Sequence, residues 1–212
     1  NTGSNVSNAL SLSTGNDKSQ SYISVATTNA TGIMPNNDYD RYNFSFRNTT
    51  NFLNNKFILD TSANYIIQND KNMVSQGQYF NPLTSLYLFP RGEDFSDVAV
   101  YERYDDLSGV NTQYWPYGDL GGVSSQNPYW IMNRMNREND RRRYKLAASL
   151  QYNIIEGLNV QGRVSIDNTE SKYTEKFHAG TVGNFAGPKG RYKEENRLDR
   201  QVYADVLANF NK

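Results

Sequence analysis

The sequence of 212 residues contains no cysteine, which excludes disulfide bonds, thiolate metal sites and a cysteine nucleophile. It also lacks an excess of either charge, because 22 Lys and Arg residues balance 22 Asp and Glu residues. This balance argues against a nucleic-acid-binding protein. Long hydrophobic runs are missing as well, and a membrane-spanning helix needs about 20 consecutive apolar residues. The sequence therefore excludes a helical membrane protein. It stays compatible with a β-barrel, in which only every second strand residue meets lipid.

Candidate catalytic chemistry is nearly absent too. The single histidine, His178, lies in a predicted loop, where a lone histidine is usually a solvated side chain. No serine lies in a G-x-S-x-G motif, and neither Asp38 with Asp40 nor Asp105 with Asp106 belongs to a calcium-binding loop motif. Carboxylate pairs for glycoside hydrolysis depend on spatial distance, and nothing in the sequence selects one. We therefore expect no enzyme activity, no catalytic residue, no metal and no cofactor.

What the sequence does contain is a repeated alternation of apolar and polar residues, the pattern of a β-strand with two different faces. The clearest alternation runs from Tyr144 to Ile154 and continues from Leu158 to Ile166, with a tight reversal at Glu156 and Gly157 between them. The segment from Leu198 to Phe210 fits both a strand and an i, i+4 helix stripe, and its neighbours favour a strand. Four earlier strands are predicted around residues 6–14, 23–25, 42–47 and 56–67.

The predicted connections between these strands fall into two classes. Short turns are expected near Asn16, Asn55 and Glu156. They alternate with longer connections over 28–40, 68–142 and 169–196. Short turns on one side and long loops on the other are typical of outer-membrane barrels, and the strands can reach the roughly 9 to 11 residues that a tilted membrane strand needs. The sequence thus predicts an all-β fold, an antiparallel transmembrane β-barrel segment of about seven strands.

The alternation also predicts which side chains face lipid. Tyr144, Leu146, Ala148, Leu150 and Tyr152 should face outward, and the intervening Lys145, Ser149, Gln151 and Asn153 should face the lumen. The basic cluster Arg141-Arg142-Arg143 is expected at the outer rim. There it would meet lipopolysaccharide phosphates or neighbouring carboxylates.

Three short signatures lie in the longest connection: Gln78-Tyr-Phe-Asn-Pro82, Phe89-Pro90-Arg91 and Asn127-Pro-Tyr-Trp130. Their order and the alternating segments on both sides resemble the SusC/RagA-like family of TonB-dependent outer-membrane transporters, over nearly the whole chain. The resemblance implies an importer of oligosaccharides or peptides in the bacterial outer membrane. It also implies a SusD-like surface lipoprotein over the barrel mouth and the TonB complex across the periplasm as partners.

The resemblance further implies that this chain is part of a larger protein. Such a barrel has roughly 22 strands around a plugged lumen, so residues 1–212 would supply about a third of the wall with a long extracellular loop at about 68–142. No segment resembles a plug domain, and the start at Asn1 without a signal segment favours an internal fragment. We therefore expect the first and last strands to pair with remaining barrel segments of the same transporter.

Aromatic residues of the longest connection are the candidate ligand- or partner-binding residues. Their flat faces with polar tips can stack on sugar rings or grip a peptide, although packing of the loop against itself is favoured for each. Trp115 is the best candidate for ligand contact, and the guanidinium of Arg91 can tie carbonyls or a carboxylate together. The candidate residues are Tyr114, Trp115, Tyr117, Tyr129, Trp130 and Arg91.

Two other classes of protein share part of this pattern. A soluble β-sandwich carbohydrate-binding module would combine alternating strands with aromatic loops in the same way. A glycan-active enzyme is the third class, although no catalytic constellation supports it. A free module should be soluble and monomeric without detergent, whereas a barrel segment should be found only with the rest of its wall.

Overall fold

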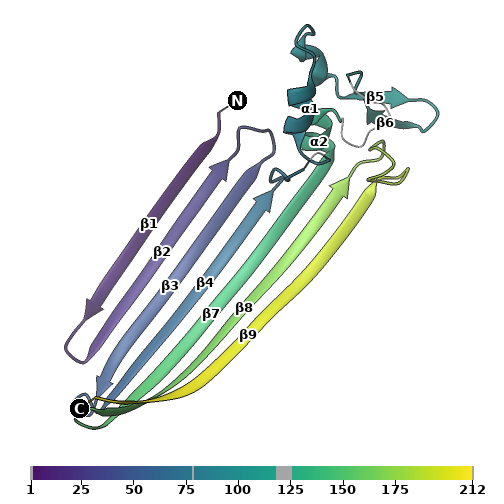
Figure 1. Cartoon of the computed structure of the whole chain (residues 1–212). Helices are drawn as coiled ribbons and strands as arrows, with labels where there is room; N and C mark the ends of the chain where they lie inside the picture. Colours follow the sequence, from purple (N-terminus) through teal and green to yellow (C-terminus); the bar gives the residue numbers. More distant parts are fainter. Residues whose placement is uncertain (1, 78, 118–125, 212) are drawn as a thin grey trace.

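The computed structural model describes residues 2–77, 79–117 and 126–211, and most of them belong to one antiparallel sheet (Figure 1). The sheet has seven strands in the order β1-β2-β3-β4-β7-β8-β9, which confirms the predicted all-β class and strand count. The last strand is a strand and not a helix. The bounds are β1 (Ser4–Gly15), β2 (Ser19–Thr31), β3 (Asp38–Phe52), β4 (Phe57–Lys71), β7 (Met135–Ile155), β8 (Leu158–Phe177) and β9 (Arg191–Phe210).

The three short turns lie together at one end of the sheet, and the other connections lie at the opposite end (Figure 1). The Asn16 side chain accepts hydrogen bonds from the backbone N–H groups of Lys18 and Ser19, at 2.9 Å each. Asn54 and Asn55 have φ of 53° and 65°, a left-handed conformation that asparagine tolerates better than most residues. Local turn chemistry thus places these reversals where the sequence predicted them.

The strands extend further than the alternation predicted, and the predicted boundaries of the long connections are wrong. Residues 32–37 join β2 to β3, residues 72–134 join β4 to β7, and residues 178–190 join β8 to β9. The Arg141-Arg142-Arg143 cluster therefore lies inside β7, between β4 and β8, and not at a loop end. The reason is that backbone hydrogen bonds continue through these polar segments without needing apolar side chains.

The register gives the sheet two different faces, because directly opposed residues on adjacent strands point to the same side. A row across all seven strands contains only apolar side chains: Leu12, Ile23, Phe46, Ala63, Leu146, Ile166 and Val202. This side, called the apolar face below, leaves Leu146 45% and Val202 63% exposed. The other side, called the polar face, is rich in charged residues and amides.

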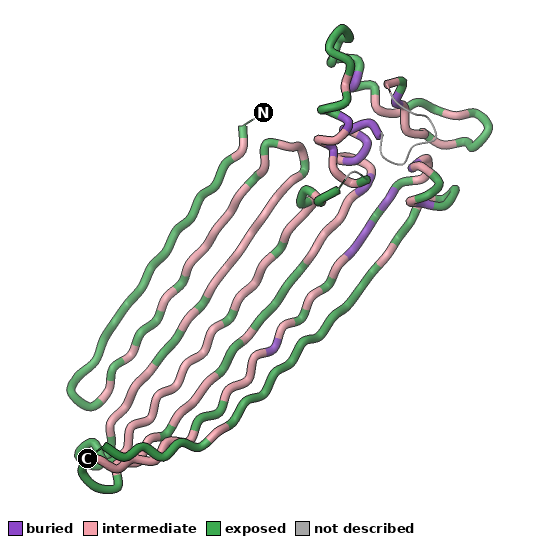
Figure 2. The backbone as a smooth tube through the Cα atoms, in the orientation of Figure 1, coloured by how far each residue is buried: buried purple, intermediate pink, exposed green. Residues whose placement is uncertain are grey.

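Burial is concentrated at one end of the sheet. Buried residues gather where the long connections meet the ends of β7 and β8, while most of the sheet is only partly covered on either side (Figure 2). Among the described residues, no helix is long and apolar enough to cross a lipid bilayer. The structure therefore consists of an open wall with one compact region above it.

Candidate functional site

The segment between β4 and β7 is a folded unit and not an irregular loop. We call the described residues of 72–134 the loop unit. It contains α1 (Pro82–Leu88), the 3-10 helix η1 (Phe95–Ala99), α2 (Pro128–Arg134), and the hairpin of β5 (Glu102–Asp105) and β6 (Val110–Gln113). Its position above one end of the sheet makes it the principal candidate for binding a ligand or partner (Figure 1).

Two of the three sequence signatures are helix starts. Asn81 caps α1 by accepting a hydrogen bond from Leu83 N at 3.0 Å, and Asn127 caps α2 by accepting one from Tyr129 N at 2.9 Å. A proline follows each asparagine, at a position where the missing N–H costs nothing and the fixed φ suits a helix. The Asn-Pro pairs thus have an architectural role, since each begins a helix of the loop unit. Gln78, at the start of the first signature, lies outside the described residues.

Asn127 does more than cap its helix. Its side-chain amide donates to Val98 O at 2.9 Å and to Tyr114 O at 3.1 Å, and the residue is only 1% exposed. Its backbone N–H donates to the Gln113 side-chain oxygen at 2.7 Å. One side chain therefore connects α2 to η1 and to the segment after β6, and it satisfies buried carbonyls that would otherwise lack a partner.

The loop unit packs onto the upper part of the polar face. Its core contains Trp130 and Ile131 of α2 with Met135 of β7 and Phe177 of β8. Met135 and Phe177 are directly opposed in the sheet and belong to the polar-face side of their strands. From the same side, the Arg137 guanidinium donates to Phe80 O at 3.4 Å and lies 5.4 Å from the Phe80 ring centroid. The loop unit consequently leans over the polar side of the wall.

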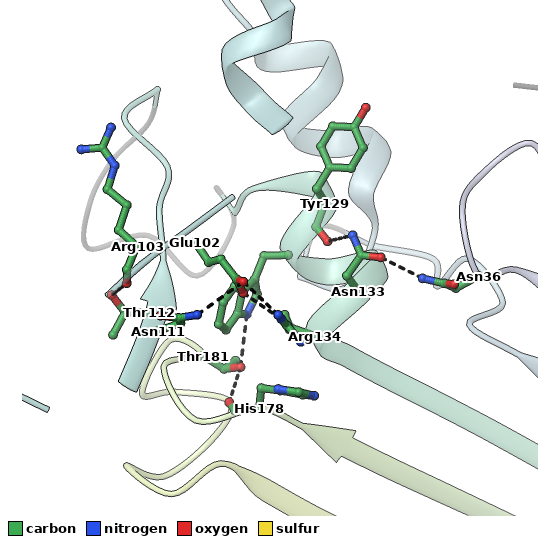
Figure 3. Close-up of polar contacts among 11 residues, drawn as sticks. Asn36, Glu102, Arg103, Asn111, Thr112, Tyr129, Asn133, Arg134, His178 and Thr181 are labelled. Carbon is green, nitrogen blue, oxygen red and sulfur yellow. Dashed lines mark hydrogen bonds and ion pairs between the residues drawn. The ribbon is translucent and has the colours of Figure 1, made fainter. Parts of the chain in front are cut away.

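A charged cluster joins the hairpin, α2 and the end of β8 (Figure 3). Glu102 and Arg134 form an ion pair, and the Asn111 amide approaches the same carboxylate at 3.5 Å. The hydrogen bond from Arg134 lowers the pKa of Glu102 and, reciprocally, raises the pKa of Arg134. Partial burial, followed by the nearby Arg134 charge, lowers the pKa of His178. The cluster therefore favours a neutral histidine beside a charged pair.

The aromatic candidates do not form a common site in this arrangement. Trp130 is 1% exposed and donates its indole N–H to Thr181 Oγ1 at 3.2 Å, so it belongs to the core. Tyr129 lies against Tyr101, with ring centroids 6.4 Å apart. Arg103 lies over the Tyr114 ring at 3.4 Å. These contacts favour the packing role for all three residues.

Trp115 and Tyr117 belong to a second aromatic group with Phe89 and Phe95. Trp115 is 8% exposed, and its ring centroid lies 5.5 Å from that of Tyr117 and 6.5 Å from that of Phe89. Arg91 is exposed, and within the described residues its guanidinium makes no ion pair or hydrogen bond. Among the described residues, Arg91 thus ties no carbonyl or carboxylate, and its role in binding a ligand or partner stays a prediction.

The polar face carries charged pairs that the candidate residues predicted from the sequence do not include. Arg47 pairs with Asp60 at 2.9 Å, Arg143 pairs with Asp167 at 2.5 Å, and Arg163 pairs with Asp205. Their alternate positions along each strand were a sequence signal, but the partners could not be assigned without the register. In the described ranges, no group of three or more His, Asp or Glu residues is placed to hold a metal ion.

No family model and no curated protein matches the sequence. The structure, however, is similar to solved ones. Structures of the RagAB peptide importer in the closed-closed and open-open states match 96% of this chain, with TM-scores of 0.64 and 0.63 and sequence identities of 12% and 14%. A structure of the RagAB peptide transporter matches 93% at a TM-score of 0.58 and 14% identity.

This similarity concerns a part of much longer chains. The present chain covers 21% to 22% of the RagAB chains that it matches. At such low identity the similarity shows the fold: a run of adjacent strands and the connections at their ends. The match does include the loop unit and the sheet together, since nearly the whole chain is covered.

Proposed function

We propose that this chain is a segment of the barrel wall, with one large extracellular loop, of a TonB-dependent, SusC-like nutrient importer in the bacterial outer membrane. The observation that carries the proposal is the sheet itself. The sheet has one apolar and one polar face, and every long connection lies at the same end of it. The chain as a whole matches a RagAB peptide importer structure over 96% of its length. Oligosaccharides or peptides would be the cargo.

The dimensions of the apolar face support a position in a membrane. On β7 the outward residues run from Tyr144 to Tyr152, which corresponds to about 27 Å along the strand. At a tilt of about 40° this becomes roughly 20 Å, close to the apolar band of about 25 Å in outer-membrane barrels. Tyrosines at both ends suit the two interfaces with water, where aromatic side chains are enriched.

The open edges and the end of the sheet suggest the partners. β1 and β9 lie at opposite edges of the sheet, where unpaired backbone groups are available to remaining barrel strands of the same transporter. A plug would face the polar side, and a SusD-like lipoprotein would approach the end that carries the loop unit. The TonB complex would act through other parts of the transporter, and outer-membrane lipid would contact the apolar face. The proposal assigns the chain no catalytic activity.

The β-sandwich alternative requires a second sheet over the apolar face. Among the described residues, the other sheet is the two-stranded hairpin of β5 and β6, which lies at the end of the wall and not across it (Figure 1). Leu146, Leu150 and Val206 of the apolar face are 45%, 47% and 74% exposed. A membrane accounts for this exposure better than a sandwich does.

Single cysteines can test the orientation, because the 212 residues of this segment contain none. Spin labels on Leu150→Cys and Gln151→Cys of the intact transporter in lipid should report opposite surroundings, oxygen-accessible for residue 150 and water-accessible for residue 151. Tyr104→Cys on β5 should react with an impermeant maleimide on whole cells, whereas Asn55→Cys at the short turns should react only after the outer membrane is opened. Equal oxygen and water accessibility of the labels at residues 150 and 151, or labelling of residue 55 on intact cells, would contradict the proposal.

A further inference from the structure

One cross-strand row on the polar face combines three arginines and contains no carboxylate. The register places Arg41 of β3, Arg141 of β7 and Arg197 of β9 on every second strand, with Gln68 and Ser171 between them. The row continues to Thr28 and Ser7 on β2 and β1. At about 4.8 Å per strand, the arginines follow each other at about 9.6 Å and span about 19 Å.

The carboxylates in the flanking rows are already bonded to other groups. Asp70 accepts hydrogen bonds from Asn139 at 3.0 Å and from Gln68 at 3.3 Å. Asp199 pairs with Arg197 at 2.7 Å, and Glu195 pairs with Lys193 at 2.6 Å. The acids nearest to the row are thus occupied on both sides of it.

Two of the three arginines consequently lack a carboxylate partner. Within the part of the chain that the structure describes, the Arg141 side chain makes no ion pair or hydrogen bond. Arg41 donates only to the Asn43 side-chain oxygen, at 3.1 Å. By contrast, Arg47, Arg143 and Arg163, lower on the same face, each pair with an aspartate. Among the described residues, the guanidinium groups of Arg41 and Arg141 therefore keep donors that no carboxylate of the wall accepts.

The row lies beneath the loop unit. Arg141 follows Arg137 by four residues on the same side of β7, and Arg137 is the residue that bonds to Phe80 O of the loop unit. A molecule that passes the loop unit on the polar side of the wall meets this row next. Guanidinium groups bind carboxylates through two parallel hydrogen bonds, so the row suits a carboxylate ligand.

We infer that Arg41 and Arg141, with Arg197 beside them, form a selectivity site for cargo that carries several carboxylates. This inference rests on the proposed transport function and specifies its substrate class. A linear ligand with acid groups about 10 Å apart can contact two arginines at once, and both an acidic peptide and an acidic oligosaccharide meet that requirement. Neutral and basic cargo gains nothing from the row.

The test compares matched cargo in cells whose outer membrane contains the complete transporter. Uptake of a Glu-rich peptide is measured against the same peptide with Gln, and uptake of an oligogalacturonate against its methyl ester. The variant Arg41→Gln with Arg141→Gln should lower the preference for the acidic member by about three- to tenfold, and raised salt should reduce the wild-type preference. If the variant loses the preference within the peptide pair, the natural cargo is an acidic peptide; if it loses the preference within the sugar pair, the cargo is an acidic oligosaccharide.

The matched control is Arg142→Gln. Arg142 directly follows Arg141 in β7, so its side chain lies on the opposite face of the sheet, and the substitution also removes one positive charge. It should leave the preference unchanged. The inference is overturned if the double variant reduces acidic and neutral uptake equally, which indicates a contact with another part of the transporter. It is also overturned if Arg142→Gln has the same effect as the double variant. If the proposed transport function is itself wrong, the result is different, because wild-type cells then import none of the four compounds.

Discussion

Glu102 on β5 and Arg134 on α2 form a bidentate ion pair, with 2.8 Å between Nε and Oε2 and 2.9 Å between Nη2 and Oε1. Both side chains are partly buried, at 23% and 30% exposure. Since Arg134 is the last residue of α2 and is followed directly by β7, the pair fixes the hairpin to the wall. The ion pair thus acts together with the backbone hydrogen bond from Gln113 N to Gly180 O, at 3.1 Å, to position the hairpin.

Arg134→Met should loosen the hairpin without unfolding the sheet. Loss of a partly buried, bidentate charged contact should lower the local free energy of opening by about 1 to 2 kcal/mol. Hydrogen exchange should accelerate in β5 and β6 and stay unchanged in β2 and β3. Arg91→Met is the matched control, because Arg91 is exposed and has no such contact with described residues. Unchanged exchange in Arg134→Met would show that the pair does not hold the hairpin.

Acidification should loosen the same region in two steps. The pKa of His178 lies below its ordinary 6.5 and that of Glu102 below its ordinary 4.5, so both bind fewer protons folded than unfolded. Above pH 6.5 both groups contribute fully to the stability of the folded loop unit. As the pH falls below 6.5, protonation of His178 lowers this stability, and below pH 4.5 protonation of Glu102 lowers it further. Exchange rates corrected for intrinsic pH dependence should reveal both steps. His178→Gln should abolish only the upper step, and an unaltered upper step would refute this assignment.

The two faces of β7 should respond differently to charge. Leu150→Arg places a cation on the apolar face opposite Leu59 and Gly162, and should cost about 2 to 4 kcal/mol near the middle of a bilayer. Gln151→Arg points to the polar face and should cost much less. Folding yield in detergent and urea midpoints of the purified transporter measure both effects. Equal losses in the two variants would remove the basis for assigning the faces.

The two helix caps should differ in importance. Asn127→Ala removes a cap and leaves the carbonyls of Val98 and Tyr114 without their donor, and should cost about 2 to 4 kcal/mol of loop-unit stability. Asn81→Ala removes only the cap bond to Leu83 and should cost about 1 kcal/mol. Proteolytic susceptibility of the loop unit gives the comparison. Similar susceptibility of both variants would indicate that the buried amide bonds contribute little.

Trp115→Ala combined with Tyr117→Ala tests the aromatic group near Phe89. If these rings bind cargo, uptake should weaken by roughly 1 kcal/mol per ring while barrel folding stays intact. If they bind a lipoprotein, the complex should loosen while the isolated lipoprotein keeps its cargo affinity. Trp115→Phe is the control, because it retains most of the packing with Phe89. A double variant with normal uptake and a normal complex would leave only the packing role.

Sequence alone determined the features that depend on neighbouring residues. Alternation from Tyr144 to Ile154 specified strand faces, because side chains of a strand point to opposite sides in turn. Asparagine and glycine at the short turns specified the reversals, because these residues tolerate left-handed backbone conformations. Strand number, strand order and the side of the long connections followed from these local signals.

Only the tertiary structure decided the features that depend on distant residues. Strand ends such as 135–143 carry no apolar alternation, so their pairing with β4 and β8 follows from the continuing ladder of backbone hydrogen bonds. Burial of Trp130 requires Phe177, which lies 47 positions later, and no local pattern distinguishes it from the other aromatic residues. The alignment of Arg41, Arg141 and Arg197 depends on register across five strands. Register is set by the whole sheet, because a shift of one residue would turn each of these side chains to the opposite face.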